Sequence, residues 1–172
     1  INAGHIPAES WVHAADEGGG RILGEVCHFV DLARYLIASP ILSVQADAAK
    51  VSDGGCDDLN VALRFADGSL ATIVYTGLGD SIYSKELIEV YSGGSVVSID
   101  NFQSFTIAEY GKLRKQSSHT QDKGFKGALQ GFVRAVSNGG PAPVNETELI
   151  ETSLATIAIM ESLREGRRIE IS

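Results

Sequence analysis

The first strong pattern along the chain is a run of apolar residues with helical spacing. Between residues 24 and 37, apolar side chains fall on most sides of the predicted helix, which indicates a helix buried between other layers. Ser39-Pro40 ends this segment, because proline cannot continue a helix. Residues 1–20 contain Gly4, Pro7 and a run of three glycines, so they are predicted to form an irregular lead-in.

From residue 41 the spacing changes to an alternation of apolar and polar positions. A period of two is typical of half-buried strands, and glycine-containing turns separate the runs. Asp67-Gly68 is the residue pair that favours the mirror-image turn of a tight hairpin. The predicted strands are 41–51, 59–65, 70–76, 87–91, 96–99, 105–109, 112–115 and 168–171.

Two more helices are predicted near the C-terminal end. The first carries an apolar stripe of Phe125, Leu129, Phe132, Val133 and Val136. The second spans residues 149–163, and Glu165-Gly166 ends it. A helix, a run of antiparallel strands and then helices predict an α+β fold, with an open, mainly antiparallel β-sheet and helices packed on one face.

The strands also carry apolar residues that this pattern assigns to the second face of the sheet. Ala62, Ala66, Ala71, Ile73 and Tyr75 are expected to point away from the helices. Such a face packs on another subunit, since monomers rarely expose large apolar patches, or is a solvated face of mixed residues. The first alternative predicts a homodimer or higher homo-oligomer.

Charge and cysteine content narrow the class of protein. The formal net charge of −8 argues against nucleic acid or an anionic membrane as partner, because both require clustered Lys and Arg. No stretch approaches the ~20 apolar residues of a membrane span.

Cys27 and Cys56 make no disulfide framework, so reduced thiols in a cytoplasmic protein are expected. Because the chain starts at Ile1, without Met or a signal peptide, we expect it to be cut from a longer protein.

The densest set of reactive side chains lies on the first predicted helix. At about 100° per residue, Glu25, His28 and Asp31 line one edge of it. A His beside carboxylates suits proton transfer near neutral pH. The alternative is a hydrogen-bonded core histidine, which is the commoner role for a single His on an apolar helix. No metal site is expected, because the later helices carry no His to complete one.

The run Gly18-Gly19-Gly20 is not a dinucleotide-binding fingerprint. It does not read Gly-x-Gly-x-x-Gly, and no strand precedes it in a βαβ context. The sequence also contains neither a nucleophile elbow nor a phosphate-binding loop with its lysine. Patterns alone therefore lead to an acidic α+β domain with one suggestive helix.

A further set of motifs extends over nearly the whole chain: Asn2-Ala3-Gly4, Trp11-Val12-His13, the run from Gly18 to Leu32, Lys85 to Val90, Asp100-Asn101-Phe102, and the segment from Phe132 to Leu163. In these motifs the chain resembles the C-terminal domain of the glucose–fructose oxidoreductase / inositol dehydrogenase / MocA family. The family helix commonly has a carboxylate four residues before its His. Here that position is Gly24, and the acid stands at Glu25.

The resemblance implies a two-domain dehydrogenase. In such enzymes an N-terminal Rossmann domain binds NAD or NADP and carries the catalytic Lys, and the C-terminal domain shapes the sugar or cyclitol site and oligomerises through its sheet. Residues 1–20 would then lead in from the missing Rossmann domain, and residues 21–172 would form the substrate-binding and oligomerisation domain.

By the same resemblance, the family's acid/base His matches His28. Glu25, on the same edge of the predicted helix, is its candidate catalytic partner. Arg21, Trp11, Asn2 and Asp31 are the candidate residues of the substrate pocket. The implied activity is NAD(P)-dependent oxidation or reduction at a sugar, nucleotide-sugar or cyclitol hydroxyl, with this chain inactive alone. The alternative is a non-catalytic ligand-binding or assembly module in which His28 is buried.

Overall fold

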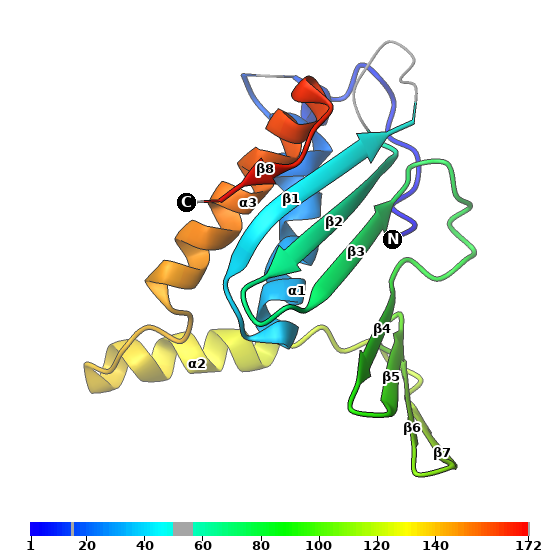
Figure 1. The fold of residues 1–172 in the computed structure, drawn as a ribbon. Coiled ribbons are helices and arrows are strands. Elements are labelled where there is room, and N and C mark those ends of the chain that lie inside the picture. Colours follow the sequence, from blue (N-terminus) through cyan, green and yellow to red (C-terminus); the bar gives the residue numbers. More distant parts are fainter. Residues whose placement is uncertain (15, 50–56, 172) are drawn as a thin grey trace. The chain divides into compact units, whose positions relative to one another are not determined.

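The computed structural model describes residues 1–14, 16–49 and 57–171, and Figure 1 shows their fold. The chain divides into two compact units. The larger unit consists of Ala3–Leu78 and Val144–Ser172, and the smaller unit of Ile1–Asn2 and Gly79–Pro143. Each unit is described by itself below.

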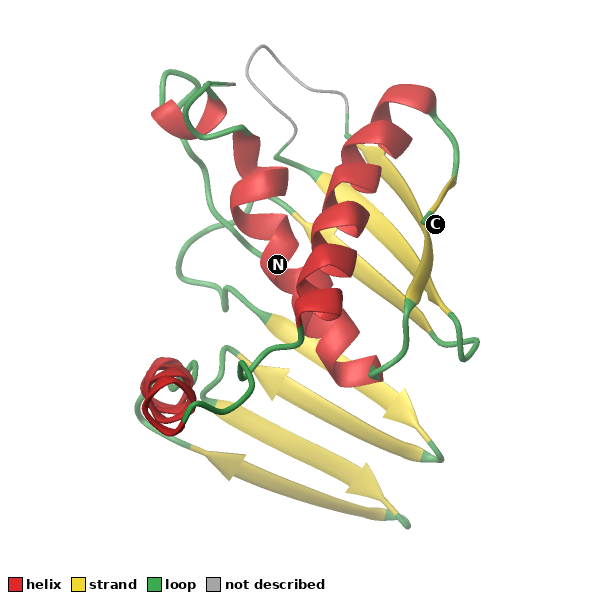
Figure 2. Ribbon diagram, turned by 90° about the vertical axis from the view of Figure 1, so that its left-hand side faces the viewer, coloured by secondary structure: helices red, strands yellow, loops and turns green. Residues whose placement is uncertain are grey.

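The larger unit is a four-stranded antiparallel sheet with two helices on one face, as Figure 2 shows. The strand order is β3-β2-β1-β8. Its elements are the 3₁₀-helix η1 (Trp11–His13), the π-helix η2 (Ile22–Val26), α1 (Cys27–Ile37), β1 (Ile41–Ala48), β2 (Leu59–Phe65), β3 (Leu70–Tyr75), α3 (Glu146–Glu165) and β8 (Ile169–Glu170). The helices and strands predicted for this part of the chain are therefore present, and the α+β fold class is confirmed.

The core of the larger unit lies between the sheet and the helices α1 and α3. Val30 from α1 and Ile159 from α3 are fully buried, as are Val44 and Val61 on the facing strands. The predicted last helix is longer than its apolar pattern suggested. It begins after Asn145, whose side chain accepts a hydrogen bond from the Thr147 backbone N–H at 2.8 Å.

The assignment of β3 to the outer face of the sheet was wrong. Val61 lies directly opposite Ile73 in the antiparallel ladder, and Leu59 lies opposite Tyr75. Residues opposite each other point to the same face, so Ile73 and Tyr75 share the helix-covered face. Ile73 is only 7% exposed and Tyr75 is fully buried. Ala71, opposite the buried Leu63, belongs to that inner face as well, and only Ala62 and Ala66 of the predicted set do not.

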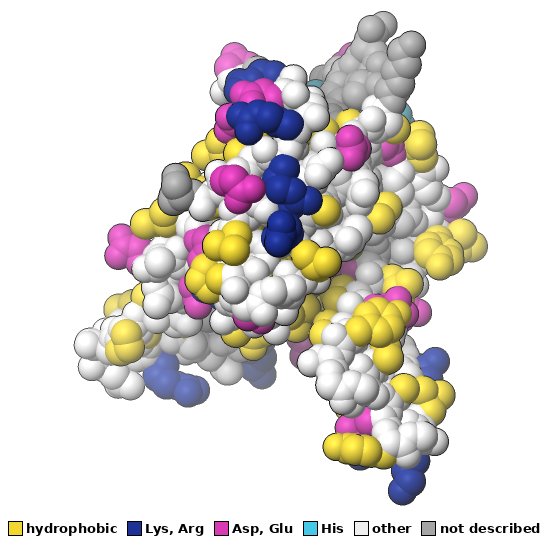
Figure 3. All heavy atoms as spheres, in the orientation of Figure 1, with side chains coloured by type: hydrophobic (Ala, Val, Ile, Leu, Met, Phe, Trp, Pro, Cys, Tyr) yellow, Lys and Arg dark blue, Asp and Glu magenta, His cyan; other side chains and the backbone are white. Residues whose placement is uncertain are grey.

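The outer face of this sheet carries scattered apolar residues among polar ones, and Figure 3 looks onto it. Leu70 and Val74 of β3 are exposed there, with Thr72 between them. Charged side chains gather at the end of α3, where Arg167 pairs with Glu165 at 2.6 Å. The prediction of an oligomer interface on this face stays a prediction.

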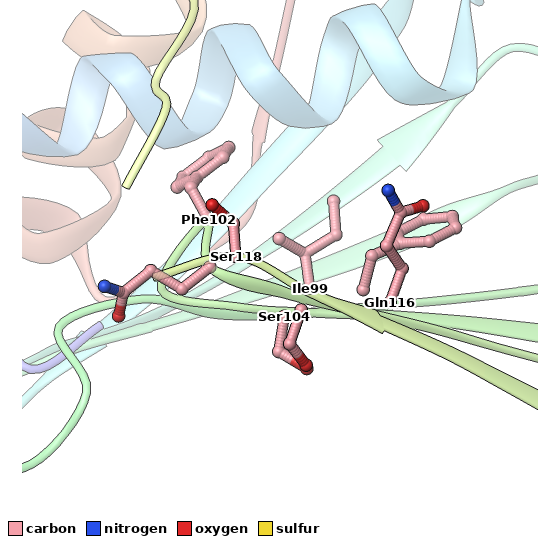
Figure 4. A pocket seen from close by; sticks show the side chains of 8 residues that line it. Ile99, Phe102, Ser104, Gln116 and Ser118 are labelled. Atoms are coloured by element: carbon pink, nitrogen blue, oxygen red, sulfur yellow. The ribbon is translucent and has the colours of Figure 1, made fainter. Parts of the chain in front are cut away.

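The smaller unit is a second four-stranded antiparallel sheet followed by one helix. Its strands β4 (Leu87–Ser92), β5 (Ser95–Asp100), β6 (Ser104–Glu109) and β7 (Lys112–Ser117) are neighbours in chain order, and α2 (Phe125–Asn138) follows them. All five residues of the predicted apolar stripe on α2 are exposed. A shallow pocket of about 230 Å³ lies on this sheet, with Phe102, Ile99 and Gln116 among its lining residues (Figure 4).

Three further observations bear on the expectations from sequence. Cys27 is a free thiol, and burial raises its pKa above the ordinary cysteine value, so it is protonated at neutral pH. Cys56 and the predicted end of the first strand lie outside the described residues. Among the helices described, none combines the length and the apolar character needed to cross a membrane.

Candidate functional site

The helix that carries the candidate residues does not start as a regular α-helix. A helical turn begins at Gly20, and the π-helix Ile22–Val26 then leads into α1 at Cys27. A π-turn has more residues per turn than an α-helix, so the uniform 100° spacing used for Glu25, His28 and Asp31 does not hold through Glu25. Such insertions in helices occur frequently at functional sites.

Arg21 lies at the head of this helix and is buried, with 1% of its side chain exposed. Its Nε and Nη2 both lie 3.1 Å from Glu25 Oε1. Its Nη1 donates to the Gly4 carbonyl at 2.7 Å, and its Nη2 donates to the Ala3 carbonyl at 3.2 Å. The guanidinium therefore joins the lead-in segment to the π-helix. Protein groups surround its charge, and a contact of Arg21 with a substrate stays a prediction.

Further polar groups surround the Arg21 guanidinium. Asp57 Oδ2 lies 3.6 Å from Arg21 Nη1 and 3.8 Å from His13 Nε2. The Tyr75 ring lies beneath the guanidinium, 5.1 Å from its carbon to the ring centroid. Burial raises the pKa of Tyr75 far above its ordinary value, and the neighbouring Glu25 carboxylate raises it further. The Tyr75 hydroxyl is therefore a neutral group at physiological pH.

Sequence reasoning did not find this cluster of Arg21, Glu25, Asp57, His13 and Tyr75. Three of its buried atoms, His13 Nδ1, Asp57 Oδ1 and Tyr75 Oη, have no hydrogen-bond partner of ordinary geometry among the described residues. The only signals in the sequence were a His in the lead-in and an Arg four residues before a Glu, which is a common helix pairing. The burial that makes the cluster distinctive has no signature in the sequence.

His28 is placed quite differently from Arg21. Its side chain is exposed, and among the described residues it forms no hydrogen bond or ion pair. Gly24, four residues earlier, is also exposed, and a Cβ added there would meet nothing within 4 Å. Asp31 is exposed as well, and it accepts a hydrogen bond from Thr152 Oγ1 at 3.5 Å. The arrangement does not fit a hydrogen-bonded core histidine, and it leaves the imidazole accessible to a ligand.

Trp11 and Asn2, the other candidate residues, each have their own local setting. Trp11 is 65% exposed on η1 in the larger unit. Asn2 belongs to the smaller unit, where its side-chain amide donates to the Asp80 carbonyl at 2.7 Å. The structure thus joins Glu25 to Arg21. Among the described residues, no group of three or more His, Cys, Asp or Glu side chains is arranged to hold a metal ion.

Gly18, in the lead-in, is held by close backbone packing, and this predicts a destabilising substitution. A Cβ at Gly18 would lie 2.6 Å from the Trp11 carbonyl oxygen and would also overlap Val12 O. Gly18→Ala should therefore lower the free energy of unfolding by about 1–3 kcal/mol, the usual cost of overpacking. Gly24→Ala is the matched control and should stabilise the helix by about 0.5–1 kcal/mol. Urea denaturation of the two variants measures both values, and equal stability would contradict this packing.

Comparison with known proteins identifies the family of this chain. The family model described as the GFO/IDH/MocA C-terminal domain matches residues 2–96. The chain belongs to the GFO/IDH/MocA family. A myo-inositol 2-dehydrogenase from Thermotoga maritima is 26% identical, over 89% of this chain and 49% of that protein.

Solved structures share the fold of this GFO/IDH/MocA domain. An aldose-aldose oxidoreductase from Caulobacter crescentus matches with a TM-score of 0.82 and 19% identity, over 98% of this chain and 52% of that one. An NAD binding oxidoreductase from Klebsiella pneumoniae matches with a TM-score of 0.79 and 16% identity, over 99% and 56%. The chain thus spans about half the length of the relatives it matches.

The described residues of this GFO/IDH/MocA domain contain no strand–turn–helix of the kind that holds the pyrophosphate of a dinucleotide. Dinucleotide-binding folds hold the pyrophosphate at a glycine-rich turn between a parallel strand and a helix. Both sheets here are antiparallel, and η2 and α1 precede the first strand of the larger unit. Nothing in this part of the chain offers the required strand–turn–helix cradle.

Proposed function

We propose that this chain is the substrate-side part of a nicotinamide-dependent oxidoreductase that acts on a hydroxyl of a sugar, nucleotide-sugar or cyclitol. The observation that carries the proposal is the exposed, unpaired imidazole of His28 on the first helix of a GFO/IDH/MocA domain. In the same proposal, NAD or NADP binds to a part of the protein outside this chain. Residues 1–20 lead in from that part, and residues 21–172 form the substrate-binding domain.

The chemistry assigned to this chain is proton transfer. Oxidation of a secondary alcohol to a ketone removes the hydroxyl proton from oxygen and the hydride from carbon. The His28 imidazole accepts that proton in the direction of oxidation and returns it in the direction of reduction. Exposure supports this role, because a general base must come within hydrogen-bond reach of the proton that it abstracts.

The substrate class is supported by what the relatives are named for and by the residues near the helix. One relative is named for myo-inositol and another for aldoses, both of which are neutral polyhydroxy compounds. The exposed ring of Trp11 offers an apolar surface of the kind on which a sugar ring packs. We also propose that the protein is cytoplasmic and assembles into a homo-oligomer through the outer sheet face, on which Leu70 and Val74 are exposed.

The alternative function is that of a ligand-binding or assembly module without catalysis. Two observations favour it: the position four residues before His28 is Gly24, and Glu25 is engaged by Arg21. In that case no carboxylate stands at the family's position before His28. Turnover by the whole protein separates the two functions.

Titration of this chain alone with two ligands tests whether it binds the substrate but not the cofactor. We expect NADH to bind negligibly, because the phosphate-holding cradle is absent from the described residues. We expect myo-inositol to shift the nuclear magnetic resonance signals of residues 24–31 more than those of β4–β7. Micromolar binding of NADH to this chain, or inositol shifts confined to the smaller unit, would contradict the proposed division.

A further inference from the structure

The Arg21 guanidinium connects three segments that are distant in sequence. It donates to the carbonyls of Ala3 and Gly4 in the lead-in, it holds Glu25 in the π-helix, and it lies over the ring of Tyr75 at the end of β3. The Ala3 backbone N–H also donates to the Thr76 carbonyl at 2.8 Å, so the lead-in is bonded to the strand end as well. We call Arg21 with these contacts the Arg21 clamp.

The clamp depends on the shape of the guanidinium as well as on its charge. Arginine presents five N–H donors in one rigid plane, whereas lysine has a single ammonium on a flexible stem. Two N–H contacts of the guanidinium reach Glu25, and two reach the carbonyls of the lead-in. Because all four start from one rigid plane, they fix the lead-in and the π-helix relative to each other. Because the side chain is buried, solvent cannot replace these partners at low cost.

We propose that Arg21 is a positioning residue that sets the place of His28 relative to the segment at residues 3–4. This inference rests on the proposed function, in which the cofactor-binding part adjoins that segment. Arg21 and His28 belong to one continuous helical segment, so a shift at Arg21 moves the imidazole. Proton and hydride must leave one substrate carbinol in aligned geometry, and a misplacement of about 1 Å costs roughly 100-fold in rate.

An arginine with a purely structural role would contribute to stability without positioning His28. Arg34 provides the matched control for such a role. Arg34 is the other buried arginine of this helical segment, and its Nε lies 3.1 Å from Glu151 Oε2 on α3. Its second acidic partner is Glu148, at 3.6 Å. Arg34 thus ties α1 to α3, and no hydrogen bond or ion pair joins it to the described residues of the lead-in. Loss of Arg34 should cost stability without moving His28 relative to residues 3–4.

The experiment compares Arg21→Met with Arg34→Met in the whole protein, using myo-inositol and aldoses deuterated at the reacting carbon. Both variants should have a lower melting temperature. Arg21→Met should also lower kcat per folded molecule by roughly 10- to 100-fold and raise the deuterium isotope effect on kcat, since the chemical step becomes slower. Arg34→Met should keep kcat within about twofold of the wild type and leave the isotope effect unchanged.

Two additions keep the test decisive. If Arg21→Met does not fold, Arg21→Lys retains the charge without the fork and should show the same loss of kcat in milder form. Hydrogen exchange on this chain should show faster exchange of the Ala3 amide in the Arg21 variant. An Arg21 variant with lower stability but normal kcat and isotope effect would overturn the inference. Normal turnover of His28→Asn, or no turnover of any polyol by the wild type, would instead count against the proposed function.

Discussion

Ile73→Arg is expected to destabilise the larger unit strongly. The side chain lies on the helix-covered face of β3, opposite the fully buried Val61, with 7% of its surface exposed. An arginine there would bury a charge without a partner, which costs about 3–5 kcal/mol. Native domains are stable by only about 5–15 kcal/mol, so this loss removes a large part of the stability and should lower the melting temperature strongly. Circular dichroism melting measures the loss.

The control for this prediction is the next residue along the strand. Val74 is 59% exposed on the outer face of the sheet, so Val74→Arg should change the free energy of unfolding by only about 0.5 kcal/mol. Light scattering of Val74→Arg also tests assembly through this face, because a charge in an apolar contact between subunits would lower the mass. A folded Ile73→Arg protein with wild-type melting would show that the assignment of β3 to the core is wrong.

The fold class could be predicted from the sequence because it depends on the spacing of apolar residues, which can be read directly along the chain. Apolar alternation located the strands, and Asp67-Gly68 located the β2–β3 hairpin. The face of β3 was assigned wrongly, because its apolar residues Leu70, Ile73, Val74 and Tyr75 occur on both faces. Only the register with β2 decides which of them point inward, and register depends on contacts between strands.

The candidate site could be predicted only in part. His28 stood out because a histidine on a glycine-led helix is chemically distinctive, and the structure places it at the surface. The π-helix could not be foreseen, because an extra residue in one turn leaves the hydrophobic pattern almost unchanged. The burial of Arg21 depends on the path of the lead-in, whose carbonyls at residues 3 and 4 come from a segment without periodicity.

The second large effect is expected for His28→Asn. If His28 transfers the substrate proton, the substitution should lower kcat of the whole protein by roughly 100- to 10,000-fold, the usual range for a general acid or base. The melting temperature should barely change, because the imidazole is exposed and forms no hydrogen bond with the described residues. Affinity for the nicotinamide cofactor should also stay the same, since the dinucleotide is proposed to bind outside this chain.

A matched variant separates this effect from a general response to losing a histidine. His119 is exposed in a polar loop of the smaller unit. His119→Asn should leave both kcat and melting temperature at the wild-type values. If both histidine variants lowered kcat equally, the loss could not be assigned to proton transfer at His28.

The most direct test of the account is the formation of reduced nicotinamide by the whole protein, incubated with NAD⁺ or NADP⁺ and a panel of myo-inositol and aldoses. Wild-type protein should reduce the cofactor with at least one of these polyols, and His28→Asn, with the same melting temperature, should be slower by at least about 100-fold. Turnover of His28→Asn at the wild-type rate, or no reduction with any polyol by the wild type, would contradict the account.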